Sequence, residues 1–480
     1  MELDGAAIHR ILGEFEDIDL GDPRRTRRVL AVLERLARHP DQSLPRLLET
    51  ERAVEGTYRL LKNEHFDFDD LLQQHREMTI ARAVQAGEVL ALHDTSICGF
   101  DHADPKAIGY LPSGKAGFLA HVSLIVDAAG HRRPLGVLHV EPLWRDKRSG
   151  RGSRRKHLSG HELAGWKGRE SERWARGVQI CQEQLEDCSV VHVMDREGDK
   201  YELLAHMQEH EERFVIRSKH DRRLTAEYGG QSLRQIVRMQ PVVLEREVRL
   251  SRRIASSAPR SAQLAPSRQA RPATLSVMAT SVVLRRPNYL GSDFPAALTV
   301  NVVHVQELEP PSGEAPIEWT LLTSEPIDSP EQLASIVDKY RYRWLIEELF
   351  KAFKTGCHYE KRRFQSRHAL LNLMAISLPI AVELLSMRAQ VAANAQAPAD
   401  EIVTPQQIEV LRAMGHRPVP ERPTAQQVLL AIAGLGGHLK RNGSPGWHVL
   451  YRGYERLLDY EAGWAAAKAA AKRASKRQNL

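Results

Sequence analysis

Short apolar runs between residues 89 and 219 constrain the fold most, because each has the length and composition of a buried β-strand. The runs are VLALHD (89–94), FLAHVSLIVD (118–127), PLGVLHVEPLW (134–144), SVVHVMDREGD (189–199) and RFVIRSK (213–219). Helical patterns from about 162 to 185 and over DKYELLAHMQEH (199–210) precede the last two runs. Three strands in a meander, then helix, strand, helix and strand, predict a mixed sheet with helices packed on it.

Two of these runs end in acids, at the strand ends where sites built on sheets usually gather. Asp94 closes the first run, and Asp195 lies in the acidic end of the fourth. An aspartate at a strand end is more often a turn former or a helix cap, so each acid alone is weak evidence of a site.

A third acid lies in the stretch YRYRWLIEELFKAFKTG (340–356), which predicts an amphipathic helix. On a helical wheel, one carboxylate falls among cations and a tyrosine in a stripe about 80° wide. The stripe contains Tyr340, Arg343, Glu347, Lys351 and Lys354, and the opposite face contains Leu345, Ile346, Leu349, Phe350 and Phe353. By itself, Glu347 would be interpreted as half of a surface ion pair.

Together, Asp94, Asp195 and Glu347 predict a magnesium site. Mg²⁺ prefers oxygen ligands and keeps coordination positions open for water and phosphate. Two ions about 4 Å apart can activate an attacking oxygen and stabilise a leaving one. Three carboxylates suffice for such a pair when a substrate phosphate completes the coordination shells, and Mn²⁺ is expected to substitute. The cations beside Glu347 would then grip phosphates.

The first 75 residues are predicted to be helical. In LGDPRRTRRVLAVLERLARHP, Asp22 is a candidate N-cap and Pro23 the first helical residue. Cations at a helix N-terminus oppose the helix dipole, and a polyanion would relieve that conflict. A solvated basic face is the alternative. The cations are Arg24, Arg25, Arg27 and Arg28, and a second helical pattern carries Tyr58 and Arg59.

The remaining chain predicts a β-rich insertion and a helical tail. LEREVRL, TLSVMATSVVL, ALTVNVVHV and IEWTLLTS place the insertion at about 225–325, with a basic loop at 251–272. The predicted domains are therefore 1–75, 76–390 with this insertion, and 391–480. In the tail, an apolar face could be a dimer seam or could pack within one chain; it contains Leu457, Leu458, Tyr460 and Trp464.

Composition favours a cytoplasmic protein with a polyanionic partner. The chain has 480 residues and a net charge of +7, a modest surplus that is weak evidence alone. No secretory signal is recognisable at the start. The most apolar run, residues 370–385, is interrupted by polar residues and predicts a buried helix rather than a membrane span. The four cysteines show no CxxC spacing, which favours a reduced compartment.

The spacing Tyr340-x₂-Arg343-x₃-Glu347-x₆-Lys354 resembles the YREK signature of bacterial cut-and-paste DDE transposases of the IS-four family. The likeness extends, in the same order, to LGDPRRTRR, HDTS, MDREGD, ERFVIRSKH, WTLLTSEP and RWLIEELFKAFKTG. It covers nearly the whole chain and is weakest at about 100–185, 225–315 and 390–430. Gly198 and the segment LPSGKAGFLAH depart from the family pattern.

The resemblance implies an α/β fold, with an RNase H-like mixed-sheet catalytic core, a β-rich insertion, and helical domains at both ends. It implies that the N-terminal domain reads the element's end sequence and that the C-terminal region dimerises. By position, Asp94, Asp195 and Glu347 match the metal-binding triad. Residues that match DNA contacts are Tyr340, Arg343, Lys351, Lys354 and Arg217, and Trp319 matches the tryptophan that stacks on a flipped base.

The expected function is therefore DNA transposition by nicking, hairpin formation and joining of 3′ ends to target DNA. The expected partners are double-stranded DNA, as element ends and as target, and a second copy of the chain in the synaptic complex, with no membrane. Two alternatives remain. An RNase H-like structure-specific nuclease would not need the basic N-terminal region or a dimerising tail, and a catalytically silent DNA-binding regulator would not need all three acids.

Overall fold

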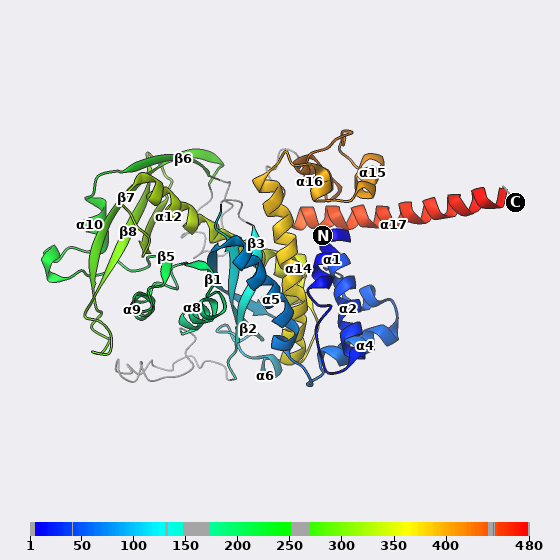
Figure 1. Ribbon diagram of the computed structural model, residues 1–480, viewed down its shortest axis with the longest axis horizontal. Coiled ribbons are helices and arrows are strands. Elements are labelled where there is room, and N and C mark those ends of the chain that lie inside the picture. The colour runs from blue at the N-terminus through cyan, green and yellow to red at the C-terminus, as the bar shows by residue number, and fades with distance from the viewer. Residues whose placement is uncertain are drawn as a thin grey trace.

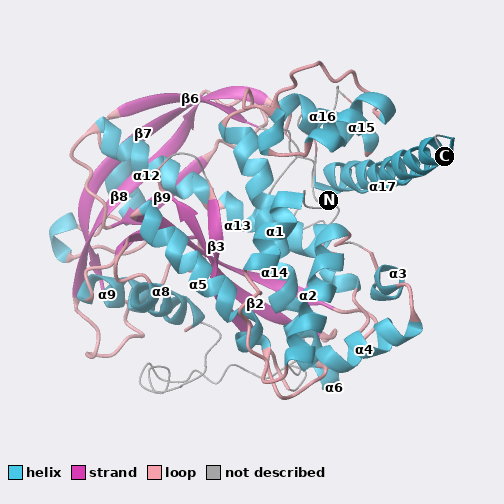
Figure 2. Cartoon of the chain, turned by 45° about the vertical axis from the view of Figure 1, so that its right-hand side comes forward, coloured by secondary structure: helices cyan, strands magenta, loops and turns pink. Residues whose placement is uncertain are grey.

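The computed structural model describes residues 5–40, 42–129, 133–146, 172–250, 268–439, 445 and 447–478. A long mixed sheet runs through the protein, as the alternation of strand and helix patterns predicted (Figure 1). Its β6–β8 end lies away from the helices contributed by the two ends of the chain (Figures 1 and 2).

The nine strands follow the order β3-β2-β1-β4-β5-β9-β8-β7-β6. Only the β1–β4 and β4–β5 pairs are parallel. The bounds are β1 Glu88–Gly99, β2 Gly117–Asp127, β3 Pro134–Leu143, β4 Ser189–Met194, β5 Arg213–Arg217, β6 Leu244–Leu250, β7 Arg271–Arg285, β8 Ala297–Leu308 and β9 Glu318–Thr323.

Strand β1 is longer than its sequence pattern indicated. The prediction that Asp94 closes a strand is wrong, because β1 continues to Gly99 and pairs with β2 along its whole second half. The parallel pairing with β4 does stop at His93 and Met194. Asp94 therefore lies where one neighbouring strand ends while the other continues.

The predicted β-rich segment contains the four expected strands, but it extends the central sheet rather than forming a separate one. Strand β9 pairs with β5, and β8, β7 and β6 follow outward. The predicted basic loop at 251–272 lies mostly outside the described residues. Its last two residues, Arg271 and Pro272, belong to β7.

Helices cover both faces of the sheet and gather beyond its β3 edge (Figure 2). The predicted helix at about 162–185 is described only as α8, and its earlier part lies outside the described residues. The first helices are α1 Gly5–Gly13, α2 Pro23–Arg38, α3 Leu44–Leu48, α4 Glu51–Leu61, α5 Phe68–Ala86 and α6 Pro105–Ile108. The next are α8 Arg173–Gln184, α9 Tyr201–Glu209, α10 Leu233–Arg238, α12 Pro330–Tyr342 and α13 Trp344–Lys351. The last are α14 Arg367–Ala393, α15 Pro405–Met414, α16 Ala425–Leu435 and α17 Trp447–Gln478, with short 3₁₀ turns at Ala226–Tyr228, Tyr359–Lys361 and Ala399–Glu401.

Helix α14 is the predicted buried apolar helix. Among the described residues, its segment Arg367–Ser386 is the one helical stretch apolar and long enough to cross a membrane, with a mean hydropathy of 1.8. However, 83% of the apolar window is buried inside the protein, against α5, α4 and β3. Burial in the core accounts for its composition.

The expected continuous helix over 340–356 is interrupted twice. Helix α12 ends at Tyr342 and α13 begins at Trp344, with Arg343 in a helical turn between them. Residues Ala352–Gly356 then form one π-helical turn. A single helical wheel therefore misplaces the two ends of this stretch, because a π turn contains more residues than an α turn.

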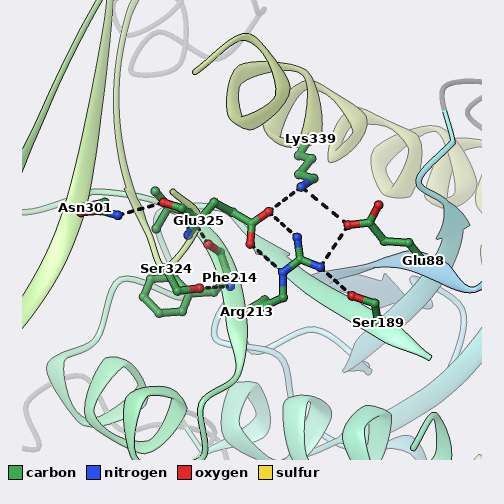
Figure 3. A network of polar contacts seen from close by, with 9 residues as sticks. Glu88, Ser189, Arg213, Phe214, Asn301, Ser324, Glu325 and Lys339 are labelled. Carbon is green, nitrogen blue, oxygen red and sulfur yellow. Dashed lines mark hydrogen bonds and ion pairs between the residues drawn. The ribbon is translucent and has the colours of Figure 1, made fainter. Parts of the chain in front are cut away.

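A polar network fixes α12 to the sheet at the edge where β1, β4 and β5 begin (Figure 3). Arg213 donates to both carboxylate oxygens of Glu325, at 2.7 and 2.6 Å, and to Glu88 at 3.0 Å. Lys339 of α12 contacts the same Glu325 carboxylate. Asn301 of β8 donates to the Glu325 carbonyl at 2.9 Å. Glu325 thus joins β5 and the helix that leads to Glu347 through its carboxylate, and β8 through its backbone carbonyl.

The two ends of the chain are helical. Asp22 caps α2 as predicted, accepting from the Arg24 amide at 2.8 Å, with Pro23 as the first helical residue. Helix α17 extends away from the rest of the protein (Figure 1). Leu457 and Leu458 are buried within the chain. For these two residues the structure therefore agrees with packing inside one chain, the alternative to a dimer seam.

Candidate active site

The sheet brings two of the three predicted acids together directly. Because His93 of β1 is paired with Met194 of β4, the next residues, Asp94 and Asp195, extend from neighbouring parallel strands. Helix α13 packs on β1 and brings Glu347 to the same place. Its buried anchors, Ile346 and Leu349, are residues that the sequence assigned to the apolar face.

Arg343 lies between two of these acids. Its guanidinium donates to Asp94 Oδ2 at 3.3 Å and also contacts the Glu347 carboxylate. The other oxygen of Asp94, Oδ1, accepts from the Thr95 amide at 2.7 Å. Arg343 therefore neutralises part of a concentrated negative charge, because one guanidinium faces two carboxylates and Asp195 carries a third.

The pKa of Asp94 reflects the balance of charges in the site. Burial, and then the negative charge of Asp195, raise the pKa of Asp94 to about 7, although Arg343 acts in the opposite direction. Glu347 adds a smaller contribution of the same sign as Asp195. A carboxyl group whose pKa is raised by other carboxylates indicates a site with room for more positive charge.

The chemistry of this donor set fits Mg²⁺ or Mn²⁺, which prefer carboxylate oxygens. Yet the described residues contain no group of three or more His, Cys, Asp or Glu side chains arranged to hold an ion. Arg343 contacts both Asp94 and Glu347, and so takes up oxygen atoms that an ion would need. Metal ligation by all three acids would require Arg343 to move.

Predicted site residues from four consecutive strands lie at the end of the sheet where β4 and β5 finish and β9 starts. Asp94 lies on β1, Asp195 follows β4, Arg217 ends β5, and Trp319 is near the start of the antiparallel β9. The Arg217 guanidinium donates to the Glu318 carbonyl at 3.1 Å, next to Trp319. The sheet order therefore brings these four residues into one row.

Tyr340 is not in a polar stripe at the surface. Its side chain is 6% exposed and packs against Trp319, with ring centroids 5.5 Å apart. The reason is a long-range contact, since Trp319 of β9 places its indole against the Tyr340 ring. Trp319 is itself half-buried and contacts the core. The structure thus joins these two predicted DNA contacts to each other.

The two lysines of the predicted stripe point to different partners. Lys351 is exposed, and its ammonium group lies 4.7 Å from the ring centroid of the exposed Trp344. Lys354, in the π turn, contacts the Ile97 carbonyl of β1 and lies 3.8 Å from Glu360. Both lysines remain close to α13, but only Lys354 is tied to the strand that carries Asp94.

A basic groove lies in the N-terminal helices. It has a volume of about 420 Å³, and its basic residues are Arg24, Arg27, Arg28 and Arg35. Arg25 is not among them and donates instead to the Leu20 carbonyl at 2.8 Å.

The two predicted residues of α4 differ in surroundings. The Tyr58 ring packs 5.1 Å from that of Phe364, so this side chain contributes to packing between α4 and the chain before α14. Arg59 is exposed and pairs with Glu55.

Arg173 has a place beside the acids that no sequence motif indicated. This buried residue of α8 donates to Thr95 Oγ1 at 2.7 Å and pairs with Glu197 at 2.8 Å. The Glu197 amide in turn donates to Asp195 Oδ1 at 2.8 Å. The partners lie in HDTS and MDREGD, but Arg173 lies in a stretch without a recognisable motif.

Arg196, also unpredicted, follows Asp195 directly. Burial, and then the like charge of Arg217, lower the pKa of Arg196. Arg234 contributes in the same direction. Arg217 and Arg234 thus lie within electrostatic reach of Arg196, the residue after Asp195, and such a group of cations suits a surface that receives phosphates.

A mixed sheet that brings three carboxylates together beside several arginines is compatible with cleavage or transfer of phosphodiester bonds. Residues 175–380 match the family described as transposase DDE domain, and residues 11–66 match the family described as transposase DNA-binding. The two matches together support a DDE transposase with DNA as its partner, and the sheet is consistent with an RNase H-like DDE domain. Asp195 and Glu347 lie within the DDE match, and the basic groove lies within the DNA-binding match.

Proposed function

We propose that this transposase is a cut-and-paste enzyme of the IS-four type, similar to the Tn-five transposase. The observation that supports this most is the convergence of Asp94, Asp195 and Glu347, from β1, β4 and α13, in a chain that also carries a transposase DNA-binding segment. A basic groove at one end and acids at the sheet edge suit a protein that holds a DNA end while cutting it.

In the proposed reaction, water nicks one strand at the element's end, and the freed 3′-OH attacks the opposite strand to give a hairpin. Water then opens the hairpin, and the 3′-OH attacks target DNA. Each step is an in-line displacement at phosphorus, in which one P–O bond forms as another breaks. One set of residues can therefore serve all four steps.

The three acids would hold two Mg²⁺ ions, or Mn²⁺, which activate the attacking oxygen and stabilise the leaving oxygen when bound. Arg343 would exchange its carboxylate partners for a DNA phosphate. Arg217, Lys351 and Lys354 would hold further phosphates, with Tyr340 supporting Trp319 as it stacks on a flipped base.

The other parts of the chain have proposed roles in recognition and assembly. The N-terminal arginines and Arg59 would contact the terminal inverted repeats, and two copies would pair two ends through their C-terminal helices. The reaction would take place in the cytoplasm, on DNA of the nucleoid.

The test is cleavage of DNA that carries the inverted repeats flanking the gene. Purified protein with Mg²⁺ is expected to nick at the repeat boundary and then to form hairpins, whereas EDTA abolishes both products. Cutting of DNA without repeats at the same rate would instead identify a general nuclease. Specific binding without any cutting would identify a regulator.

A further inference from the structure

Asp199 is a buried carboxylate four residues beyond Asp195 whose hydrogen bonds all go to another loop. Its side chain is 0% exposed. Oδ2 accepts from the amides of Lys219 and His220, at 2.6 and 3.1 Å, and from Ser218 Oγ at 3.2 Å. Oδ1 accepts from Arg222 Nε at 3.1 Å and from a second nitrogen of the same guanidinium.

The two loops joined in this way are the ones that follow β4 and β5. The first carries Asp195, whose Oδ1 accepts from the Glu197 amide and whose carbonyl accepts from the Gly198 amide at 3.1 Å. The second follows Arg217, the last residue of β5. Asp199 thus connects the turn that holds an acid to the turn that holds a cation, at the same edge of the sheet.

The first turn has little freedom of its own. Gly198 is buried, and a Cβ at this position would lie 2.8 Å from Met194 Cβ, the last residue of β4. Glycine lets the turn fold back directly onto the strand. As a result, the position of Asp195 determines the position of Asp199. Asp199 in turn determines the position of the loop after β5 through its hydrogen bonds.

We propose that Asp199 is a positioning residue for DNA cleavage, which sets the loop that follows Arg217 in register with Asp195. This inference rests on the proposed function, since it takes Asp195 as a metal ligand and Arg217 as a phosphate contact. A carboxylate suits this role because it can accept several hydrogen bonds at once. Two amides, one hydroxyl and the Arg222 guanidinium all donate to Asp199. A misplacement of about 1 Å between reacting groups can cost about 100-fold in rate.

The experiment compares Asp199→Asn with the double variant Asp199→Asn/Arg222→Met. The single change leaves the Arg222 guanidinium buried without its carboxylate, which destabilises the fold. The double change removes that charge as well. If the single variant does not fold, the double variant therefore still tests whether Asp199 is needed for cleavage. Glu307→Gln is the matched control, because Glu307 is also buried, pairs with Arg271, and accepts from the Ile317 amide at 3.1 Å.

Three measurements are made on each variant: the thermal midpoint, the dissociation constant for end DNA, and the first-strand nicking rate at saturating DNA. Asp199→Asn and Glu307→Gln should both lower the midpoint. The double variant should recover most of the decrease in midpoint that Asp199→Asn causes. Its nicking rate should nevertheless stay about 100-fold below wild type. End binding should change only a few fold, and Glu307→Gln should nick at the wild-type rate.

Recovery of nicking together with stability in the double variant would overturn the proposal, as would a nicking rate in Asp199→Asn equal to that of Glu307→Gln. The wild-type protein separates this failure from a failure of the proposed function. If wild type does not cut end DNA at all, the transposase reaction itself is wrong.

Discussion

Arg343 and Asp94, which are 249 residues apart in the sequence, form an ion pair with 3.3 Å between guanidinium nitrogen and carboxylate oxygen. The same guanidinium contacts Glu347. Arg343 therefore takes the position of a cation among acids that are suited to bind one. A divalent ion and Arg343 should compete for these carboxylates.

Arg343→Gln is expected to lower the thermal midpoint in EDTA, because two carboxylates lose their counter-charge. The destabilisation should be smaller than that of breaking a fully buried pair, roughly 3–5 kcal/mol, since the site is partly open. Added Mg²⁺ should then raise the midpoint of this variant more than that of wild type, and Mn²⁺ should bind it more tightly in electron paramagnetic resonance titrations. Lys351→Gln is the control, because this exposed lysine of α13 contacts the Trp344 ring. Equal metal affinity in wild type and Arg343→Gln would contradict the competition.

The three acids should be individually essential for cleavage. Asp94→Asn, Asp195→Asn and Glu347→Gln each keep the side-chain shape and remove a charged ligand. Nicking of end DNA in Mg²⁺ should fall below detection in all three, while gel-shift affinity for the same DNA stays within a few fold. Substantial nicking by any one of them would remove that residue from the proposed triad.

The raised pKa of Asp94 predicts a pH dependence of stability. In the unfolded chain this group ionises near its ordinary pKa of 3.8, whereas the folded protein holds its proton to about pH 7. The folded state thus binds more protons between these values, and this contribution to stability is lost as pH rises toward 7. At about 1.4 kcal/mol per pKa unit, its upper bound is about 4 kcal/mol.

Asp94→Asn tests this effect in EDTA. The variant should be more stable than wild type at pH 8, and the difference should shrink at pH 5, where the wild-type carboxyl is protonated. Thermal midpoints at the two pH values provide the measurement. Identical pH profiles for the two proteins would show that Asp94 is not the group responsible.

The basic groove should account for much of the salt dependence of end binding. Replacing Arg24, Arg27 and Arg28 with Ala should weaken binding and reduce the slope of log affinity against log salt by about 0.9 for each phosphate that is no longer neutralised. Arg25→Ala should change the slope less, since its guanidinium is held by the Leu20 carbonyl. Arg38→Ala, at the other end of α2, is the control. An unchanged slope in the triple variant would mean that these arginines form only a solvated face.

Trp319 should matter for hairpin formation more than for the first nick. A hairpin requires a base to leave the stack at a cost of a few kcal/mol, and stacking on an indole can return about 1–3 kcal/mol. Trp319→Ala is expected to bind ends and nick normally, but to accumulate nicked DNA. Trp319→Phe, which keeps a ring against Tyr340, should be less impaired, and DNA lacking that base should partly rescue the Ala variant. If nicking and hairpin formation slow equally, Trp319 is only a core residue.

The sequence predicted the parts of the fold that depend on local pattern. The strands of the β-rich segment, the cap at Asp22 and the buried helix after residue 367 all follow from alternation, capping chemistry or apolar length. The end of β1 was misjudged because its second half is stabilised by pairing with β2, which no local pattern reveals.

The candidate site was predictable in its acids and less so in its surroundings. Motifs indicated Asp94, Asp195 and Glu347, but not the burial of Tyr340 or its contact with the Trp319 ring. Arg173 is placed by a contact with β1 and Asp199 by contacts with the loop after β5, and sequence spacing contains no information about such contacts.

The strand order β4-β5-β9 sets the sideways distance between Asp195 and Trp319. Adjacent strands are about 4.8 Å apart, so two hydrogen-bonded spacings separate the strand that ends beside Asp195 from the strand that carries Trp319, roughly 10 Å in all. That span is about three nucleotide steps along one DNA strand. A phosphate held at the acids and a base held at the indole would keep this sideways offset when the lengths of the surrounding loops change, because it is set by the pairing of the strands.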